Sequence, residues 1–200
     1  LESALDSAND VIIAPEFFLS GFSVLPYDVY EERLSHLLQL SRGRKVLIVP
    51  GSMLTQISKD TNIVKNIVPI LSDGRILKIF EKGSETGEEK LTSHAGFVYK
   101  KGDNSKNFFS HNNQIYSVEI CRDHGRQVIP NDTDFQIIPS YDNRAGFYDP
   151  LNNVLKERFM FLADGQRKLA AACKYIPEGK NRFQLLKGEK TQYGRVFNVK

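Results

Sequence analysis

Short apolar runs separated by polar turns dominate the chain. Three of these runs, VIIA, VLIV and QIIP, carry no polar alternation. A continuous apolar run of this length is typical of a strand that is buried on both faces of its sheet. The sequence therefore predicts buried strands within the segments Asp10–Phe18, Lys45–Leu54 and Thr133–Ser140.

One segment between these runs has helical spacing instead. Apolar residues recur at steps of three and four within Tyr27–Arg42, and Gly43 follows as a stop signal, so a helix is predicted there. Further along the chain, Asp73 and Gly74 separate two apolar segments. Asp-Gly between such segments is a strong hairpin signal, and two paired strands are predicted over 62–82.

The rest of the chain is predicted to hold more strands and a second helix. Strands are expected within Gly96–Cys121, around a Gly-Asp-Asn turn, and a last one within Gly194–Lys200. A helix is expected to start at Asp149 as the cap, with Pro150 in its first position. This mixture of hairpins and βα units predicts one α/β or α+β domain over residues 1–200, with helices covering a sheet.

Composition and charge exclude several classes of protein. The net charge is only +3, and the basic stretches are short, so nucleic acid is not expected as a partner. No apolar run approaches the roughly 20 residues that a membrane span needs. Neither a signal peptide nor a membrane partner is expected.

The cysteines and histidines indicate whether disulfides or a metal site should be expected. Two cysteines cannot form a disulfide framework, and the four histidines are scattered. We therefore expect reduced thiols and a cytoplasmic protein. No metal site and no cofactor are expected.

Three residues whose side chains could take part in catalysis each follow a predicted strand: Glu16, Lys82 and Cys121. A thiol near pKa 8.5 is only a few per cent ionised at neutral pH and needs a base to become a nucleophile. A carboxylate can accept its proton, and a fixed cation can stabilise an oxyanion. Each residue alone is more often structural, a capping or surface carboxylate, a surface lysine or a core cysteine.

The order of three sequence motifs favours a catalytic role for these residues. PEFFLSGF at Pro15–Phe22, NIVPILSDGRILKIFEKGSETGEE at Asn66–Glu89 and VEICRD at Val118–Asp123 resemble the three signature regions of the nitrilase, or carbon–nitrogen hydrolase, superfamily. They occur in the order of the family and at about its separations. The resemblance covers most of the chain between Asp10 and Ser140. It implies a four-layer αββα sandwich made of two mixed sheets with helices outside.

The resemblance also implies roles for residues. Glu16 matches the general base of the family, Cys121 its nucleophile and Lys82 its oxyanion-stabilising lysine. Lys78 competes for the last role, although the distance of Lys82 from the Asp-Gly turn fits the family better. For a second, supporting carboxylate the candidates are Glu88 and Glu89. Of these two, Glu88 is the better match to the motif.

The activity implied is hydrolysis of carbon–nitrogen bonds other than peptide bonds, in a small amide, ureide or nitrile, through a cysteine thioester. The family resemblance further implies a homodimer or larger assembly. Asp123 is expected to anchor the turn after the cysteine, and His124 to line a pocket or the surface.

The chain also departs from the family pattern. HGRQVIP at His124–Pro130 replaces the usual aromatic-Pro-Glu turn, and we expect the first strand of the family to be missing. These departures leave open an alternative, a protein of this fold that works chiefly as a binding or interaction module. A papain-like Cys–His protease is disfavoured because the sequence around Cys121 has no signature of that kind.

Overall fold

We analysed a computed structural model of the chain. It describes residues 10–103, 107–123, 132–141, 159–166, 169–175, 183–191 and 194–197. The chain divides into two compact units, Leu1–Asn104 and Ser105–Lys200. The expectation of one domain over residues 1–200 stays a prediction.

The first unit is built on a six-stranded mixed sheet whose central strand is β4 (Ile63–Ser72). β1 (Val11–Ile13) pairs in parallel with β2 (Leu47–Val49), and β2 pairs antiparallel with β4. β3 (Met53–Gln56), β5 (Arg75–Glu81) and β6 (Val98–Tyr99) also pair with β4. This long strand therefore holds most of the unit together.

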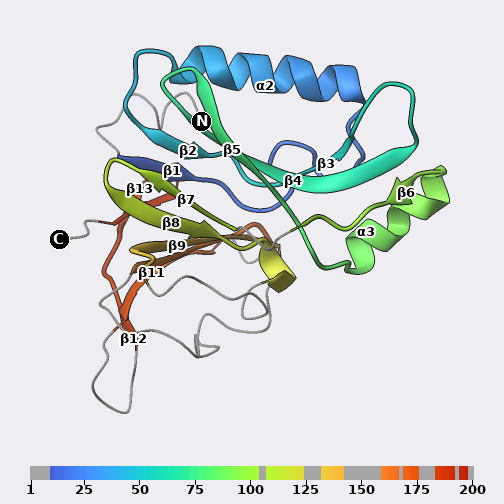
Figure 1. The fold of residues 1–200 in the computed structure, drawn as a ribbon. Helices are drawn as coiled ribbons and strands as arrows, with labels where there is room; N and C mark the ends of the chain where they lie inside the picture. Colours follow the sequence, from blue (N-terminus) through green and yellow to red (C-terminus); the bar gives the residue numbers. More distant parts are fainter. Residues whose placement is uncertain are drawn as a thin grey trace. The chain divides into compact units, whose positions relative to one another are not determined.

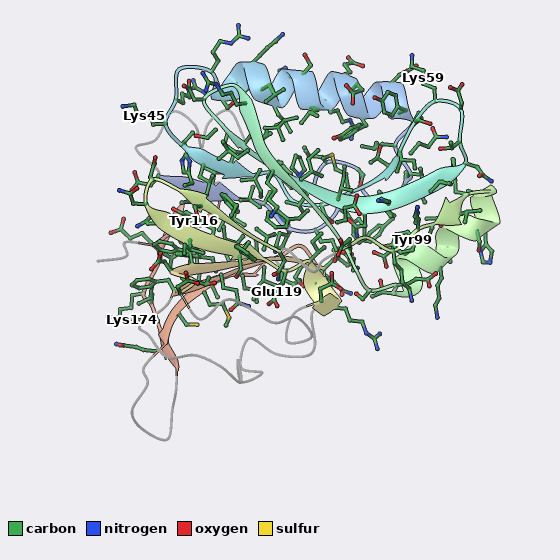
Figure 2. All side chains as sticks on the ribbon, viewed as in Figure 1. Lys45, Lys59, Tyr99, Tyr116, Glu119 and Lys174 are labelled. Carbon is green, nitrogen blue, oxygen red and sulfur yellow. The ribbon has the colours of Figure 1, made fainter. Side chains whose placement is uncertain are left out.

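The predicted helix is present as α2 (Tyr27–Ser41), which lies along one face of this sheet (Figure 1). Its buried side chains pack with sheet residues into a hydrophobic core made of Leu25, Tyr30, Leu34, Leu37, Val46, Ile48, Met53, Ile67 and Leu71. Basic side chains such as Lys45 and Lys59 are exposed (Figure 2). The helix ends where predicted: Arg42, the next residue, is already extended with ψ 132°, and Gly43 follows with a left-handed φ of 72°.

The predicted hairpin is also confirmed. Asp73 and Gly74 join β4 to β5 with φ angles of 49° and 71°, and two positive φ angles are what a tight type I′ turn requires. After β5 the chain forms the short helix α3 (Gly87–Leu91) and the 3-10 helix η1 (Thr92–Ala95).

The second unit contains another six-stranded mixed sheet, in the order β12-β11-β10-β9-β8-β7. Its strands are β7 (Phe108–His111), β8 (Gln114–Val118), β9 (Phe135–Ser140), β10 (Phe159–Asp164), β11 (Leu169–Tyr175) and β12 (Phe183–Leu185). The strands β13 (Glu189–Thr191) and β14 (Gly194–Val196) form a separate pair. β14 confirms the strand predicted within Gly194–Lys200.

Stacked aromatic rings cross this second sheet. The ring of Tyr116, labelled in Figure 2, lies 5.2 Å from that of Phe109 and 5.1 Å from that of Phe135. Phe135 in turn stacks on Phe159 at 5.8 Å. Cross-strand aromatic pairs of this kind stabilise neighbouring strands and fix their register.

Two predictions about single segments need correction, and a third lies outside the described residues. The Lys45–Leu54 segment forms two strands, β2 and β3, because Gly51 between them has a left-handed φ of 81°. β1 is only partly buried, whereas β2 is fully buried and β9 almost so. The helix expected to start at Asp149 lies outside the described residues up to position 158 and stays a prediction, and Phe159–Asp164 further along is strand β10.

The fold class is α/β with two mixed sheets, as predicted. Among the described residues of the second unit the only helical element is the 3-10 helix η2 (Cys121–Asp123). No helix in the described ranges is both long and apolar enough to cross a membrane.

Candidate active site

Glu16 lies just beyond the end of β1, in a backbone turn that is held tightly. The strand pairing continues to Ala14, whose N–H donates to the Val49 carbonyl at 2.8 Å. Phe17 then adopts a φ of 60°, a conformation that bulky residues rarely take. Its N–H lies 3.4 Å from the hydroxyl oxygen of Ser52. The turn directs the carboxylate of Glu16 into the first unit, where the residue is 3% exposed.

Lys82 follows the last residue of β5, and several backbone contacts hold it there. Its N–H donates to the Asn66 carbonyl at 2.8 Å, and its carbonyl accepts from Gly102 N–H at 2.9 Å. The Tyr99 hydroxyl lies 3.3 Å from the same carbonyl oxygen. The side chain is therefore anchored at its base, and the residue is only 1% exposed.

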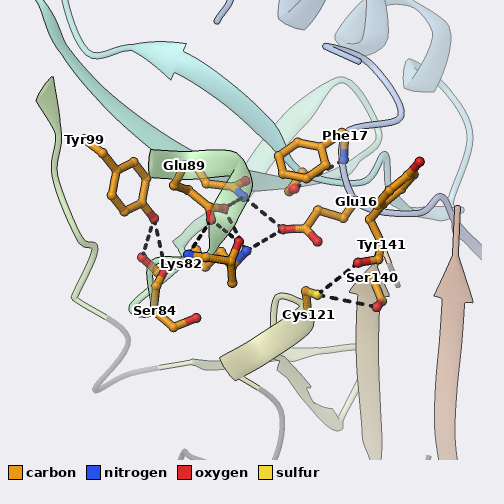
Figure 3. A network of polar contacts seen from close by, with 12 residues as sticks. Glu16, Phe17, Lys82, Ser84, Glu89, Tyr99, Cys121, Ser140 and Tyr141 are labelled. Carbon is orange, nitrogen blue, oxygen red and sulfur yellow. Dashed lines mark hydrogen bonds and ion pairs between the residues drawn. The ribbon is translucent and has the colours of Figure 1, made fainter. Parts of the chain in front are cut away.

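These two residues meet Glu89 in a buried polar cluster (Figure 3), to which Asn66 also belongs. Lys82 Nζ lies 2.8 Å from Glu16 Oε1 and 2.7 Å from Glu89 Oε1. Asn66 Nδ2 donates to the same two oxygens, at 3.0 Å and 2.9 Å. One ammonium and one amide thus bridge two carboxylates.

Glu89 is held by more donors than these two. The Thr86 N–H donates to Glu89 Oε2 at 2.8 Å, and the Thr86 hydroxyl contacts the same oxygen. Threonine and glutamate three residues apart form the capping box that starts α3. Burial raises the pKa of the Glu89 carboxyl, but the charge of Lys82 and the hydrogen bonds from Lys82, Thr86 and Asn66 outweigh it, and the pKa is lowered. Glu89 is therefore a fixed anion of the cluster.

Cys121 belongs to the second unit and lies where a strand gives way to a turn, as predicted. β8 ends at Val118, and Cys121 is the first residue of η2 with a left-handed φ of 48°. Its sulfur lies 3.5 Å from the Tyr141 carbonyl oxygen and 3.6 Å from the Ser140 hydroxyl. The residue is 7% exposed.

Cys173 differs clearly from Cys121. It lies on β11, packs with Ile138, Met160 and Leu162, and has no exposed surface. Burial raises the pKa of its thiol to about 12, despite a backbone hydrogen bond from Met160 that lowers it. Cys173 is thus a core residue, and its thiol is not ionised at neutral pH.

This chain resembles known proteins in its fold and not in its sequence. No protein-family model matches the chain, and no curated protein matches it by sequence. Among solved structures, the NitN amidase from Nesterenkonia sp. AN1 is 16% identical with a TM-score of 0.63, over 100% of this chain and 83% of that chain.

Variants of the same amidase match similarly. One carries acrylamide added to its active-site cysteine and is 17% identical with a TM-score of 0.63, over 100% of this chain and 83% of its own. Another is in complex with butyramide and is 16% identical with a TM-score of 0.62, over 98% of this chain and 77% of its own. These structures are amidases from the nitrilase superfamily. The chain has the nitrilase-superfamily fold.

Within this nitrilase fold the predicted site residues divide between the two units. The first unit brings Glu16, Lys82 and Glu89 into direct contact. Cys121 lies in the second unit, and its association with that cluster stays a prediction. Among the described residues no group of three or more His, Cys, Asp and Glu side chains could hold a metal ion.

The alternative candidates have different surroundings. Lys78 is partly exposed, and its ammonium lies 5.0 Å from the centre of the Phe80 ring. The backbone of Glu88 is part of α3, while its side chain lies outside the described part of the structure. His124 and the rest of the His124–Pro130 segment also lie outside it. Asp123 is buried, and its N–H donates to the Ile120 carbonyl at 3.0 Å.

Sequence reasoning did not assign a role to Asn66, Ser140 or Asp164. Each is a polar residue within or at the end of a buried strand, and each is less than 4% exposed. A polar residue inside an apolar run needs a hydrogen-bond partner, and that signal was available in the sequence. Which partner each one takes depends on the register between strands, which the sequence does not show.

Proposed function

We propose that this protein hydrolyses a carbon–nitrogen bond other than a peptide bond, in a small amide, ureide or nitrile. In this proposal Cys121 is the nucleophile, Glu16 the general base and Lys82 the cation that stabilises the oxyanion, with Glu89 as a supporting carboxylate. The observation that carries it is the buried contact of Lys82 with the carboxylates of both Glu16 and Glu89.

Charge supports the assignment of Glu16 as the base. Lys82 contacts the carboxylates of both Glu16 and Glu89, so the two carboxylates share one ammonium. Glu89 is stabilised as an anion by Lys82, Asn66 and Thr86. We therefore assign to Glu16 the proton transfer that a general base performs.

The reaction would run in two halves. Glu16 takes the proton of Cys121 as the sulfur attacks the amide carbon, and Lys82 stabilises the oxyanion. The C–N bond then breaks, and Glu16 gives the proton to the departing amine, which leaves a thioester. A water molecule then loses a proton to Glu16 as it attacks the thioester, and the C–S bond breaks. The acid leaves, and the proton returns to Cys121.

The substrate class is supported by the neighbours of this fold. One variant of the Nesterenkonia amidase is described in complex with butyramide, a small aliphatic amide. We therefore place small amides first, before ureides and nitriles. We also propose a cytoplasmic location and a homodimer, which the reduced thiols and the resemblance to the superfamily suggest.

Ammonia release over a panel of small amides, ureides and nitriles tests the proposal. Cys121→Ala and Lys82→Met should lower release by on the order of a thousandfold, since nucleophile and oxyanion stabilisation are lost. Cys173→Ala is the matched control and should retain activity. If no compound releases ammonia, or if Cys121→Ala is as active as the wild type, the hydrolase proposal is wrong. The first result would favour the binding module.

A further inference from the structure

The thiol of Cys121 contacts a serine, Ser140, which in turn contacts an aspartate, Asp164. The Ser140 hydroxyl oxygen is 3.6 Å from Cys121 Sγ and 3.3 Å from Asp164 Oδ2 (Figure 3 shows the contact of Ser140 with Cys121). All three residues are buried, and Ser140 has no exposed surface. The contacts therefore form a short chain from carboxylate to hydroxyl to sulfur.

Sheet register explains why these residues meet. β8, β9 and β10 run parallel, and Ser140 pairs directly with Asp164 at the end of β9 and β10. Val118 pairs with Ile137, so Cys121 and Ser140 both lie three residues beyond that pair. The carboxyl ends of parallel strands share one edge of a sheet, where functional side chains commonly gather.

The hydroxyl of Ser140 has one proton and two acceptors for it. With the thiol neutral, the hydroxyl can donate to Asp164, and the S–H to the Tyr141 carbonyl oxygen 3.5 Å away. Once the thiol has lost its proton, the sulfur is a stronger acceptor, and the hydroxyl can turn to it. The Tyr141 carbonyl then opposes the negative charge, whereas the Ser140 hydroxyl stabilises it.

We propose that Ser140 is a positioning residue that stabilises the thiolate of Cys121, and that Asp164 tunes it by competing for the same proton. This inference rests on the proposed role of Cys121 as the nucleophile. Among the described residues of the second unit, the charged groups near the cluster include Asp164 on β10, the buried Asp123 and the exposed Arg122 on η2 itself, and the buried Glu119 two residues before Cys121.

Two substitutions should shift the Cys121 pKa in opposite directions. Ser140→Ala removes the donor, and the pKa should rise by about one unit, the size expected for one hydrogen bond to a charged group. Asp164→Asn removes a negative charge and leaves a weaker, neutral acceptor for the hydroxyl proton, so the pKa should fall. Ser140→Thr keeps the hydroxyl and should restore most of the wild-type value.

The measurement is the rate of iodoacetamide labelling of Cys121 between pH 5 and pH 10, followed by peptide mass spectrometry. Ser117→Ala is the matched control, because Ser117 is a fully buried serine on β8 whose hydroxyl has no hydrogen-bond partner in the described part of the chain. It should leave the Cys121 pKa unchanged. Cys173 does not interfere at these pH values because the pKa of its thiol is about 12.

Every outcome bears on the inference. Equal shifts in Ser140→Ala and Ser117→Ala, or a raised pKa in Asp164→Asn, would overturn it. If Ser140→Ala does not fold, the sign of the Asp164→Asn shift decides. Labelling does not require turnover, so the function is tested separately. A shifted pKa without ammonia release contradicts the hydrolase, whereas release with an unshifted pKa contradicts only the role of Ser140.

Discussion

Lys82 illustrates how strongly single residues depend on one another in the first unit. It lies out of contact with water, between the carboxylates of Glu16 and Glu89. Removing one member of a buried ion pair leaves the other charge uncompensated and typically costs about 3–5 kcal/mol of stability. Variants of this cluster must therefore be checked for folding before their activity is interpreted.

Asn66 should matter as much for stability as the charged residues. In Asn66→Leu the amide that bridges Glu16 and Glu89 is lost, and both buried carboxylates lose a donor. We expect a loss of about 2–5 kcal/mol in the free energy of unfolding, measured by urea denaturation. The exposed Asn62, which donates to the Gly96 carbonyl, is the matched control, and Asn62→Leu should cost below about 1 kcal/mol. Equal losses in both variants would contradict the bridging role.

The two thiols should react at very different rates. Cys173 has a pKa of about 12 and no exposed surface, so at pH 8 its thiolate fraction is on the order of one in ten thousand. Iodoacetamide should therefore label Cys121 at least a hundredfold faster, as resolved by peptide mass spectrometry. Slow labelling of both cysteines at one rate would argue against an activated Cys121 and for a binding protein.

At the scale of elements, the turn after β1 depends on a glycine from another segment. Gly51 lies so close to Pro15 that a Cβ at position 51 would stand 1.9 Å from the Pro15 carbonyl oxygen. Only glycine allows this approach, which places Pro15 and Glu16 beside the loop between β2 and β3.

Gly51→Ala should therefore disturb the position of Glu16. We expect a loss of a few kcal/mol in the free energy of unfolding and a clear fall in ammonia release. Gly43→Ala is the control, because Gly43 also has a left-handed φ but its Cβ would meet nothing within 4 Å. That variant should cost only about 1 kcal/mol of backbone strain. Similar results for the two variants would rule out the steric explanation.

The elements that the sequence predicted well are those with local signals. The helix over Tyr27–Ser41 and the hairpin at Asp73–Gly74 follow from periodicity and turn residues alone. The break between β2 and β3 was not predicted, although Gly51 takes a left-handed φ between them and the Pro-Gly dipeptide at 50–51 is a common turn signal. The helix expected to start at Asp149 lies outside the described residues up to position 158, and strand β10 further along pairs in parallel with β9, a partner that local signals do not indicate.

The same distinction applies to the candidate site. Glu16, Lys82 and Cys121 could be proposed from the sequence because each follows a strand in a recognisable motif. The supporting carboxylate was less clear. The motif favoured Glu88, and the contact with Lys82 is made by Glu89. Only the capping box, with Thr86 three residues before Glu89, could have indicated which carboxylate turns inward.

At the scale of the whole molecule, the cluster should make stability depend on acidity. The folded-state pKa of Glu89 is lowered below its ordinary value of 4.5, so Glu89 binds protons more weakly in the folded than in the unfolded state. Its contribution to stability is therefore complete above about pH 4.5 and is lost as the pH falls through the lower, folded-state pKa.

Thermal unfolding of Glu89→Gln and of the wild type between pH 7 and pH 3 tests this. The wild type should be more stable at pH 7, and the difference should shrink below about pH 4.5 as Glu89 becomes protonated. Glu32→Gln on the exposed face of α2 should show no such difference. A gap between Glu89→Gln and the wild type that stays constant with pH would contradict the assigned charge state.

The left-handed φ of 48° at Cys121 has a consequence for how an inactive form of this protein should be made. Any side chain at that position is held in an unfavourable conformation, at a cost of about 1–2 kcal/mol, which glycine escapes. Cys121→Gly should therefore tolerate heating at least as well as Cys121→Ala, as calorimetry would show. For trapping uncleaved substrate, glycine is the better replacement at this position.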